Sequence, residues 1–195
     1  MKKLLAAIFA LVFSQSVHAQ EVNLSCQTVS AQTSVSFTTG WNSTFFDVYI
    51  FRLYNVSQST GVNAQMVATV STDGGGTYAS TNYVVEALSQ YTTEGVASLS
   101  TSGTRANWFA SVDAADTAGY GSNGTITLFN LGGGSNVAWY QAEIEKYESG
   151  GGNVIGMRAG GYWKGSPGTL INGLKMEMTS GTMTGKFCMS GIRKQ

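Results

Sequence analysis

The residue types that carry most catalytic chemistry are scarce in this chain. It contains one histidine, His18, and two cysteines, Cys26 and Cys188. Serine and cysteine nucleophiles generally need a histidine base, and histidine is the commonest zinc ligand. Because His18 lies in a segment that we expect to be cleaved off, we expect no histidine-based triad in the mature protein. No spacing marks two carboxylates as an acid and base pair. We therefore predict a non-enzymatic protein with no cofactor and no metal site.

The clearest candidate for ligand binding is the segment Tyr162-Trp163-Lys164. It lies in the glycine-rich stretch 160–168, so we expect a loop in which aromatic rings can stack on the faces of sugars. The competing interpretation is that one ring caps the core and the other is an incidental surface aromatic. The remaining tryptophans lie in or beside predicted strands and are expected in the core: Trp41, Trp108 and Trp139.

A calcium site is a weaker candidate. Asp113 and Asp116, together with Asn123, could offer oxygen ligands to calcium in a loop. Their spacing matches no EF-hand, and acidic groups in a loop rich in glycine, serine and asparagine need no metal. We therefore assign no metal there. Asp73, which precedes Gly74-Gly75-Gly76, is interpreted as a turn former.

Residues 1–19 have the organisation of a bacterial-type signal peptide. Lys2-Lys3 precedes an apolar run from Leu4 to Phe13, and Val17-His18-Ala19 suits cleavage after a small residue, which predicts Gln20 as the mature N-terminus. The run is shorter than the roughly 20 apolar residues of a membrane anchor. Cleavage leaves nine basic residues against eleven acidic ones, a net charge of −2. With no basic stripe in the sequence, we expect no nucleic-acid partner.

Export bears on the two cysteines, because an oxidising compartment favours their pairing. A Cys26–Cys188 disulfide would close nearly the whole domain, and the loop-entropy estimate for that span is about 5 kcal/mol as an upper figure. The alternative is two unrelated buried thiols. Cys188 alternates with Phe187 and Met189, so we expect the disulfide on the outer face of the fold.

The composition predicts one domain, residues 20–195, after the signal peptide. The chain has 195 residues, of which 43% are hydrophobic and only 11% charged, with 25 glycines and one proline. That length can build one sizeable core. Period-two alternation dominates, and no segment has a convincing amphipathic helix pattern. The predicted strands cover residues 45–54, 65–71, 83–85, 108–112, 125–130, 137–146, 153–157, 174–179 and 183–189.

Two of the connections between these strands carry tight-turn signals. Asp73-Gly74-Gly75-Gly76 predicts a hairpin from 65–71 to 83–85, and Ser180-Gly181 predicts a C-terminal hairpin from 174–179 to 183–189. Short strands with glycine-rich turns indicate an all-β fold, an antiparallel β-sandwich that is jelly-roll-like. A closed barrel is the nearest alternative.

Several segments in this order resemble bacteriophage virion proteins. They are 46–51, where Asp47 lies among aromatic and β-branched residues, the run 71–78 around Asp73-Gly74-Gly75, the run 170–174, and the glycine-containing end from Ser180-Gly181 to Gly191-Ile192. The resemblance spans roughly residues 45–192. It implies a β-sandwich of tails, fibres or capsid surfaces with no catalytic residues. Tyr162-Trp163-Lys164 also resembles a strand of alginate-lyase-type sandwiches, but their glutamine-isoleucine-histidine segment is missing, so we expect no lyase.

We therefore expect a non-enzymatic, virion-associated structural or adhesion protein, exported to the periplasm or beyond, or carried on a virion surface. Its expected partners are other virion or surface subunits, in a homo-oligomer, and host surface glycans bound through Tyr162, Trp163 and Lys164. No membrane span is expected in the mature chain. The alternative function is that of a secreted bacterial carbohydrate-binding module or cell-surface subunit.

Overall fold

A computed structural model of the chain describes residues 20–59, 66–91, 95–103, 121–129, 137–148, 153–166 and 169–194. The predicted signal peptide, the predicted strand around Trp108, and the candidate calcium ligands Asp113 and Asp116 lie outside these residues. Among the residues described, none forms a helix with the length and apolar character that a membrane span requires.

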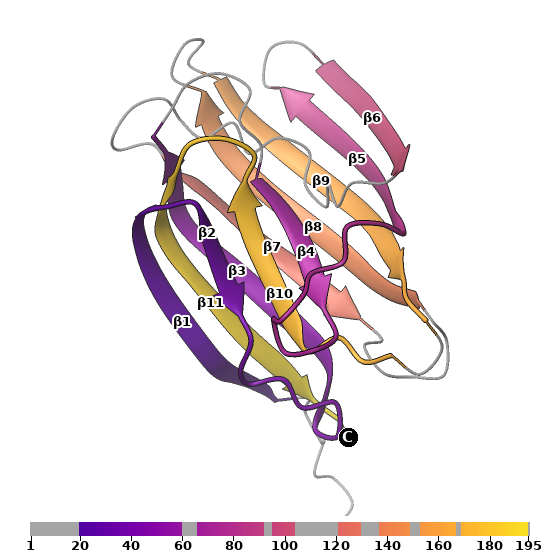
Figure 1. Ribbon diagram of the computed structural model, residues 1–195. Helices are drawn as coiled ribbons and strands as arrows, with labels where there is room; N and C mark the ends of the chain where they lie inside the picture. Colours follow the sequence, from indigo (N-terminus) through magenta and orange to yellow (C-terminus); the bar gives the residue numbers. More distant parts are fainter. Residues whose placement is uncertain are drawn as a thin grey trace, which may run out of the picture.

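The described part of the chain folds into two antiparallel β-sheets that pack face to face (Figure 1), which confirms the all-β sandwich. The larger sheet has eight strands in the order β1-β11-β3-β7-β8-β9-β5-β6, and the smaller has three in the order β2-β10-β4. The bounds are β1 (Glu21–Gln32), β2 (Ser34–Phe37), β3 (Phe46–Gln58), β4 (Met66–Ser71), β5 (Tyr83–Tyr91), β6 (Gly95–Gly103), β7 (Ser122–Phe129), β8 (Val137–Glu148), β9 (Asn153–Lys164), β10 (Gly173–Met178) and β11 (Met183–Arg193).

The core lies between the two sheets and is built from alternate residues of their strands. In the small sheet, Leu174 and Met176 of β10 are fully buried. In the large sheet, Phe51 and Leu53 of β3 and Phe187 of β11 point to the same core. Side chains at the intervening positions of these strands face outward, so the alternation in the sequence does mark one apolar face on each strand.

Both predicted hairpins are wrong, because the strands concerned lie in different sheets. β10 pairs with β2 and β4 in the small sheet, whereas β11 pairs with β1 and β3 in the large one. Likewise β4 belongs to the small sheet and β5 to the large sheet. The physical reason is that two consecutive strands can bury their apolar faces by facing each other across the core as well as by pairing edge to edge. Alternation alone does not distinguish these arrangements.

The turn chemistry predicted at Asp73 is nevertheless present. Its carboxylate accepts hydrogen bonds from the Thr77 backbone N–H (2.9 Å), the Thr77 hydroxyl (2.7 Å) and the Ser71 hydroxyl (2.7 Å). These bonds, those from Thr77 first, hold the pKa of Asp73 far below its usual range. Gly74 and Gly75 adopt positive φ angles of 73° and 96°, which glycine tolerates at no steric cost. The turn therefore redirects the chain from one sheet to the other.

Candidate functional site

The outer face of the eight-stranded sheet is the surface on which candidate binding residues gather. Along β8, Tyr140, Ala142 and Ile144 are buried against the core, whereas Gln141 and Glu143 are exposed on the opposite face. In the view of Figure 1, the small sheet lies in front of the large one, so the outer face is the rear face of the larger sheet. The small sheet does not cover this face.

The three residues of the predicted ligand site do not lie together. They end strand β9 and so are not in a loop, and strand geometry sends successive side chains to opposite faces. Tyr162 and Lys164 lie on the outer face, but Trp163 points into the core and is only 8% exposed. The expectation of an exposed Trp163 ring is therefore wrong. Ligand binding by Tyr162 and Lys164 stays a prediction.

The glycines around these residues suggest a loop in the sequence, but in the structure they allow close packing within a strand. Gly161 lies inside β9, where a Cβ atom would collide with the Val84 carbonyl oxygen and approach a carbon of the Tyr140 ring to 2.7 Å. A glycine in a strand commonly marks such a close approach. Residues 160–164 of this loop-like stretch therefore belong to an internal strand, which is paired with β5 on one side and β8 on the other.

The outer face does carry an exposed tryptophan ring, but it is that of Trp139. It was predicted to be core, but 51% of it is exposed, and its ring lies 5.1 Å from the Tyr162 ring with an interplanar angle of 59°. The alternation of side chains along β8 could have revealed this exposure, because Trp139 lies on the same face of the strand as the polar residues Gln141 and Glu143. Trp41, also predicted to be core, is partly buried against the core, and its Nε1 donates a hydrogen bond to the Phe37 carbonyl oxygen at 2.9 Å.

Trp139 and Tyr162 belong to a line of apolar side chains that crosses six neighbouring strands. Residues directly opposite each other in an antiparallel pair have Cβ atoms about 5 Å apart. The pairings run from β11 through β3, β7, β8 and β9 to β5 and join, in order, Ile192, Val48, Phe129, Trp139, Tyr162 and Val84. We call these six residues the apolar row. All except Trp139 are partly buried by their neighbours.

The neighbouring line of outward residues has a different character. Two residues away from the apolar row along each strand, the pairings join a second line of outward side chains: Ser190, Ile50, Thr127, Gln141 and Gly160. Only Ile50 among them is large and apolar. The apolar row is thus a distinct feature at one end of the sheet. Sequence reasoning missed it because a cross-strand line depends on register, which single-strand periodicity does not report.

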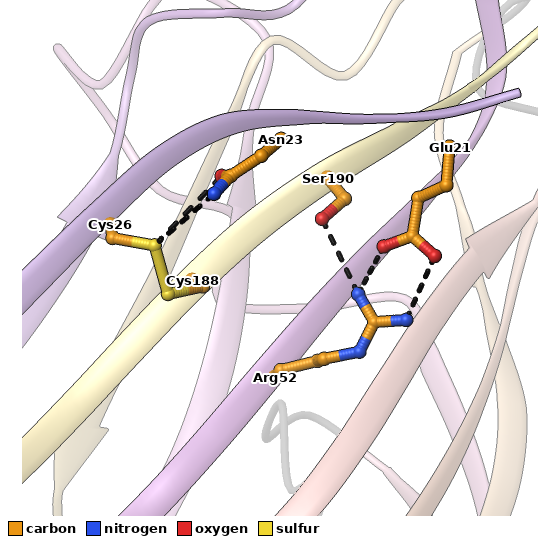
Figure 2. Close-up of a disulfide and its surroundings, with 6 residues drawn as sticks. All are labelled: Glu21, Asn23, Cys26, Arg52, Cys188 and Ser190. Atoms are coloured by element: carbon orange, nitrogen blue, oxygen red, sulfur yellow. Dashed lines mark hydrogen bonds and ion pairs between the residues drawn. A yellow bond between two sulfur atoms is a disulfide. The ribbon is translucent and has the colours of Figure 1, made fainter.

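A polar groove of about 740 Å³ adjoins this row where β1, β11 and β3 meet. Arg52 donates two hydrogen bonds to the Glu21 carboxylate, one of them 2.9 Å long, and a third to the Ser190 hydroxyl at 3.3 Å (Figure 2). The hydrogen bond from Arg52 lowers the pKa of Glu21, and the same bond raises the pKa of Arg52. The groove is lined by Glu21, Asn23, Cys26, Arg52, Tyr54, Lys186, Cys188 and Ser190.

The predicted disulfide is present and lines this groove. Cys26 and Cys188 are bonded, lie opposite each other in the β1–β11 register, and are separated by 162 positions in the sequence. Both sulfurs lie on the outer face, as expected from the alternation of Cys188 with Phe187 and Met189. A disulfide is typical of an oxidising compartment such as the periplasm or the extracellular space.

The described residues provide no evident metal centre. No group of three or more histidines, cysteines, aspartates and glutamates among them is placed to hold a metal ion. Asn123, the one candidate calcium ligand that is described, accepts a hydrogen bond through its side-chain oxygen from the Asn55 backbone N–H at 2.9 Å. Its oxygen therefore already has a structural partner.

Comparison with protein-family models, with curated protein sequences and with solved structures finds no match to this chain.

Proposed function

We propose that this chain is an exported, non-enzymatic structural or adhesion protein that binds carbohydrate on the outer face of its eight-stranded sheet. The observation that carries the proposal is the exposed Trp139 ring, held beside Tyr162 within the apolar row. Sugars present flat faces of C–H groups, which pack against aromatic rings, and the rim of hydroxyls needs nearby polar partners. Gln141 and Lys164 are exposed on the same face and can supply them.

The shape of the surface favours an extended glycan over a single sugar. Phe129, Trp139 and Tyr162 lie on three neighbouring strands, so their backbones span about 10 Å across the sheet. The apolar row continues beyond both ends of this aromatic segment, to Val48 and to Val84. A glycan chain running across the strands would contact the whole row, whereas a monosaccharide would contact one or two rings.

The resemblance to bacteriophage virion surface proteins supports a role in attachment to a host surface, with binding subunits arranged in a symmetric assembly. The second candidate is a secreted bacterial carbohydrate-binding module or cell-surface subunit. The Cys26–Cys188 disulfide favours that alternative, because it is typical of proteins that mature in an oxidising compartment. Mass spectrometry of purified virions and of culture medium distinguishes the two locations.

The test of binding compares Trp139→Ala with Tyr54→Ala on a glycan array and then by titration with the best glycan. Tyr54 is a matched control, because it is an exposed aromatic (42%) on the same face but six positions from Val48 along β3, about 20 Å away. We expect Trp139→Ala to weaken binding about tenfold, which corresponds to about 1.4 kcal/mol, and Tyr54→Ala to leave it unchanged.

Any of three results would contradict the proposal. Binding by Trp139→Ala with wild-type affinity excludes the apolar row as the binding surface. Loss of binding by Tyr54→Ala, with Trp139→Ala intact, moves the site to the polar groove. An array that yields no ligand for folded wild-type protein removes the carbohydrate hypothesis and leaves subunit contacts as the role of the row.

A further inference from the structure

Strand β1 is held to the fold in an unusual way. None of its twelve residues is buried, whereas its neighbour β11 contributes Met183, Phe187 and Met189, all fully buried, to the core. The apolar side chains of β1 that reach the core, Val22, Leu24 and Val29, are only partly buried. As an edge strand with little buried apolar surface, β1 can separate from β11 more readily than any inner strand of the large sheet.

Specific contacts compensate for this weak burial. Besides its backbone pairing with β11, β1 is attached by the Cys26–Cys188 disulfide and by the ion pair between Glu21 and Arg52 of β3 (Figure 2). Gln27 adds a hydrogen bond from its side-chain nitrogen to the Ser36 carbonyl oxygen at 2.7 Å. Each of these contacts joins β1 to another strand, so each can form equally well when β1 comes from another copy of the chain.

The connection that follows β1 is short and strained. β1 belongs to the large sheet and β2 to the small one, and only Thr33 lies between them. Just before this corner, Ala31 has a φ of 50°, and the β1–β11 register shifts between Val29 and Gln32. A left-handed alanine is unfavourable, and short strained connections promote the exchange of the element that they join. Opening the corner would make β1 and β2 one continuous extended segment.

We propose that two copies of this chain exchange their β1 strands, each β1 pairing with β11 of the other copy, and that the Cys26–Cys188 bond then joins the two chains. The occupant is a second copy because only β1 of the same sequence places a cysteine opposite Cys188 and a carboxylate opposite Arg52. The exchange is reciprocal, so the assembly has two-fold symmetry. This inference does not depend on carbohydrate binding.

The covalent step is thiol oxidation. The Cys26 and Cys188 thiols lose two electrons and two protons to a disulfide-bearing oxidant of the exporting compartment, and the two sulfurs become bonded. Before oxidation the closed monomer and the exchanged dimer interconvert, and their ratio depends on chain concentration. Oxidation fixes whichever form is present.

Co-expression of two differently tagged variants, Cys26→Ser and Cys188→Ser, tests the exchange in the exporting compartment. Neither variant can form the internal bond, so a Cys26–Cys188 bond in this mixture must join two chains. Cys188 is 8% exposed and lies opposite position 26 in the β1–β11 register, so we expect a bond to Cys26 of a second chain only where β1 of that chain occupies this register. We expect a reducible dimer that carries both tags and yields the Cys26–Cys188 peptide. Folded, monomeric variants with free thiols would overturn the proposal.

Wild-type protein provides a second test that requires neither variant to fold. Equal amounts of unlabelled and nitrogen-15-labelled chain are reduced, unfolded, mixed and refolded with oxidant at increasing concentration. Mixed-label Cys26–Cys188 peptides should rise with concentration toward half of the total, whereas same-label pairs alone at every concentration would overturn the exchange. A three-residue glycine-serine insertion after Thr33 relaxes the corner and should lower the mixed fraction at least severalfold. An undiminished fraction would contradict exchange through this corner.

Discussion

Trp163 provides a sharp test of the core, because two substitutions at this position should have opposite outcomes. The side chain is 8% exposed and lies between Tyr83 of β5 and Ala138 of β8 in the sheet register. Its ring also packs on the backbone of Gly165, where a Cβ atom would collide with it. Trp163→Ala removes all of these contacts. Truncation of a buried tryptophan costs about 3–5 kcal/mol, so the melting temperature should fall by roughly 6–20 °C.

Trp163→Phe should behave differently because of the indole nitrogen. Nε1 is buried and has no hydrogen-bond partner among the described residues. Leaving a buried donor unsatisfied costs about 1–3 kcal/mol. Phenylalanine removes the donor, keeps most of the ring, and gives up apolar contact worth about 1 kcal/mol. The two effects offset each other, and the melting temperature of Trp163→Phe should stay within a few degrees of wild type or rise.

Thermal unfolding followed by circular dichroism, in the absence of reductant, measures both variants under one condition. If Trp163→Ala melts within about 2 °C of wild type, the ring is not part of the core and the strand assignment of residues 153–164 is wrong. If Trp163→Phe is destabilised as strongly as Trp163→Ala, the indole nitrogen has a partner that stabilises the fold. Glycan binding measured well below the melting temperature should persist in both variants, because the ring faces inward.

Three other outcomes follow from the structure. Cys26→Ser or reduction of the disulfide should lower the free energy of unfolding by at most about 5 kcal/mol. That upper figure corresponds to a melting temperature at most roughly 10–20 °C lower with reductant than without, and an unchanged melting temperature would contradict the prediction. Asp73→Asn should destabilise the protein at neutral pH. Because the folded-state pKa of Asp73 is lowered, the stability that its charge contributes is fully present above about pH 4 and declines as the pH falls toward the folded-state pKa. In a pH series of melting curves, the difference in melting temperature between Asp73→Asn and wild type should therefore become smaller in acid. N-terminal sequencing of exported protein should begin at Gln20, and recovery of Met1 would contradict cleavage.

The sandwich itself was predictable because its physical basis is local. Alternation in segments such as 174–178 marks one apolar face per strand, and an all-β chain with one core must bury those faces against each other. The disulfide was predictable from the expected oxidising compartment, and the parity of Cys188 relative to Phe187 predicted the outer face for its sulfur. Pairing partners were not predictable, because β10 and β11 have the same pattern whether they pair in one sheet or face each other across the core.

The candidate site was predicted only in part, and the error concerns which face each side chain occupies. Tyr162 and Lys164 lie on the outer face of the sheet. Their glycine-rich surroundings were interpreted as a loop, so the alternation of a strand, which would have placed Trp163 in the core, was not applied. Trp139 was assigned to the core because it lies in a predicted strand, although its alternation with Gln141 and Glu143 indicated the solvent-facing side. The apolar row depends on register between six strands and lies beyond the reach of single-segment patterns.

The bond between the first and last strands also has a mechanical meaning. Gln20 and Arg193 lie side by side, with the Arg193 backbone N–H donating to the Gln20 carbonyl oxygen at 3.1 Å. A tensile load applied through these two residues would peel β1 from β11 one pair at a time and stop at Cys26–Cys188. Only about 45 Å of extended chain would be released before the disulfide carries the force. The 162-position span that the bond encloses would remain shielded from that load.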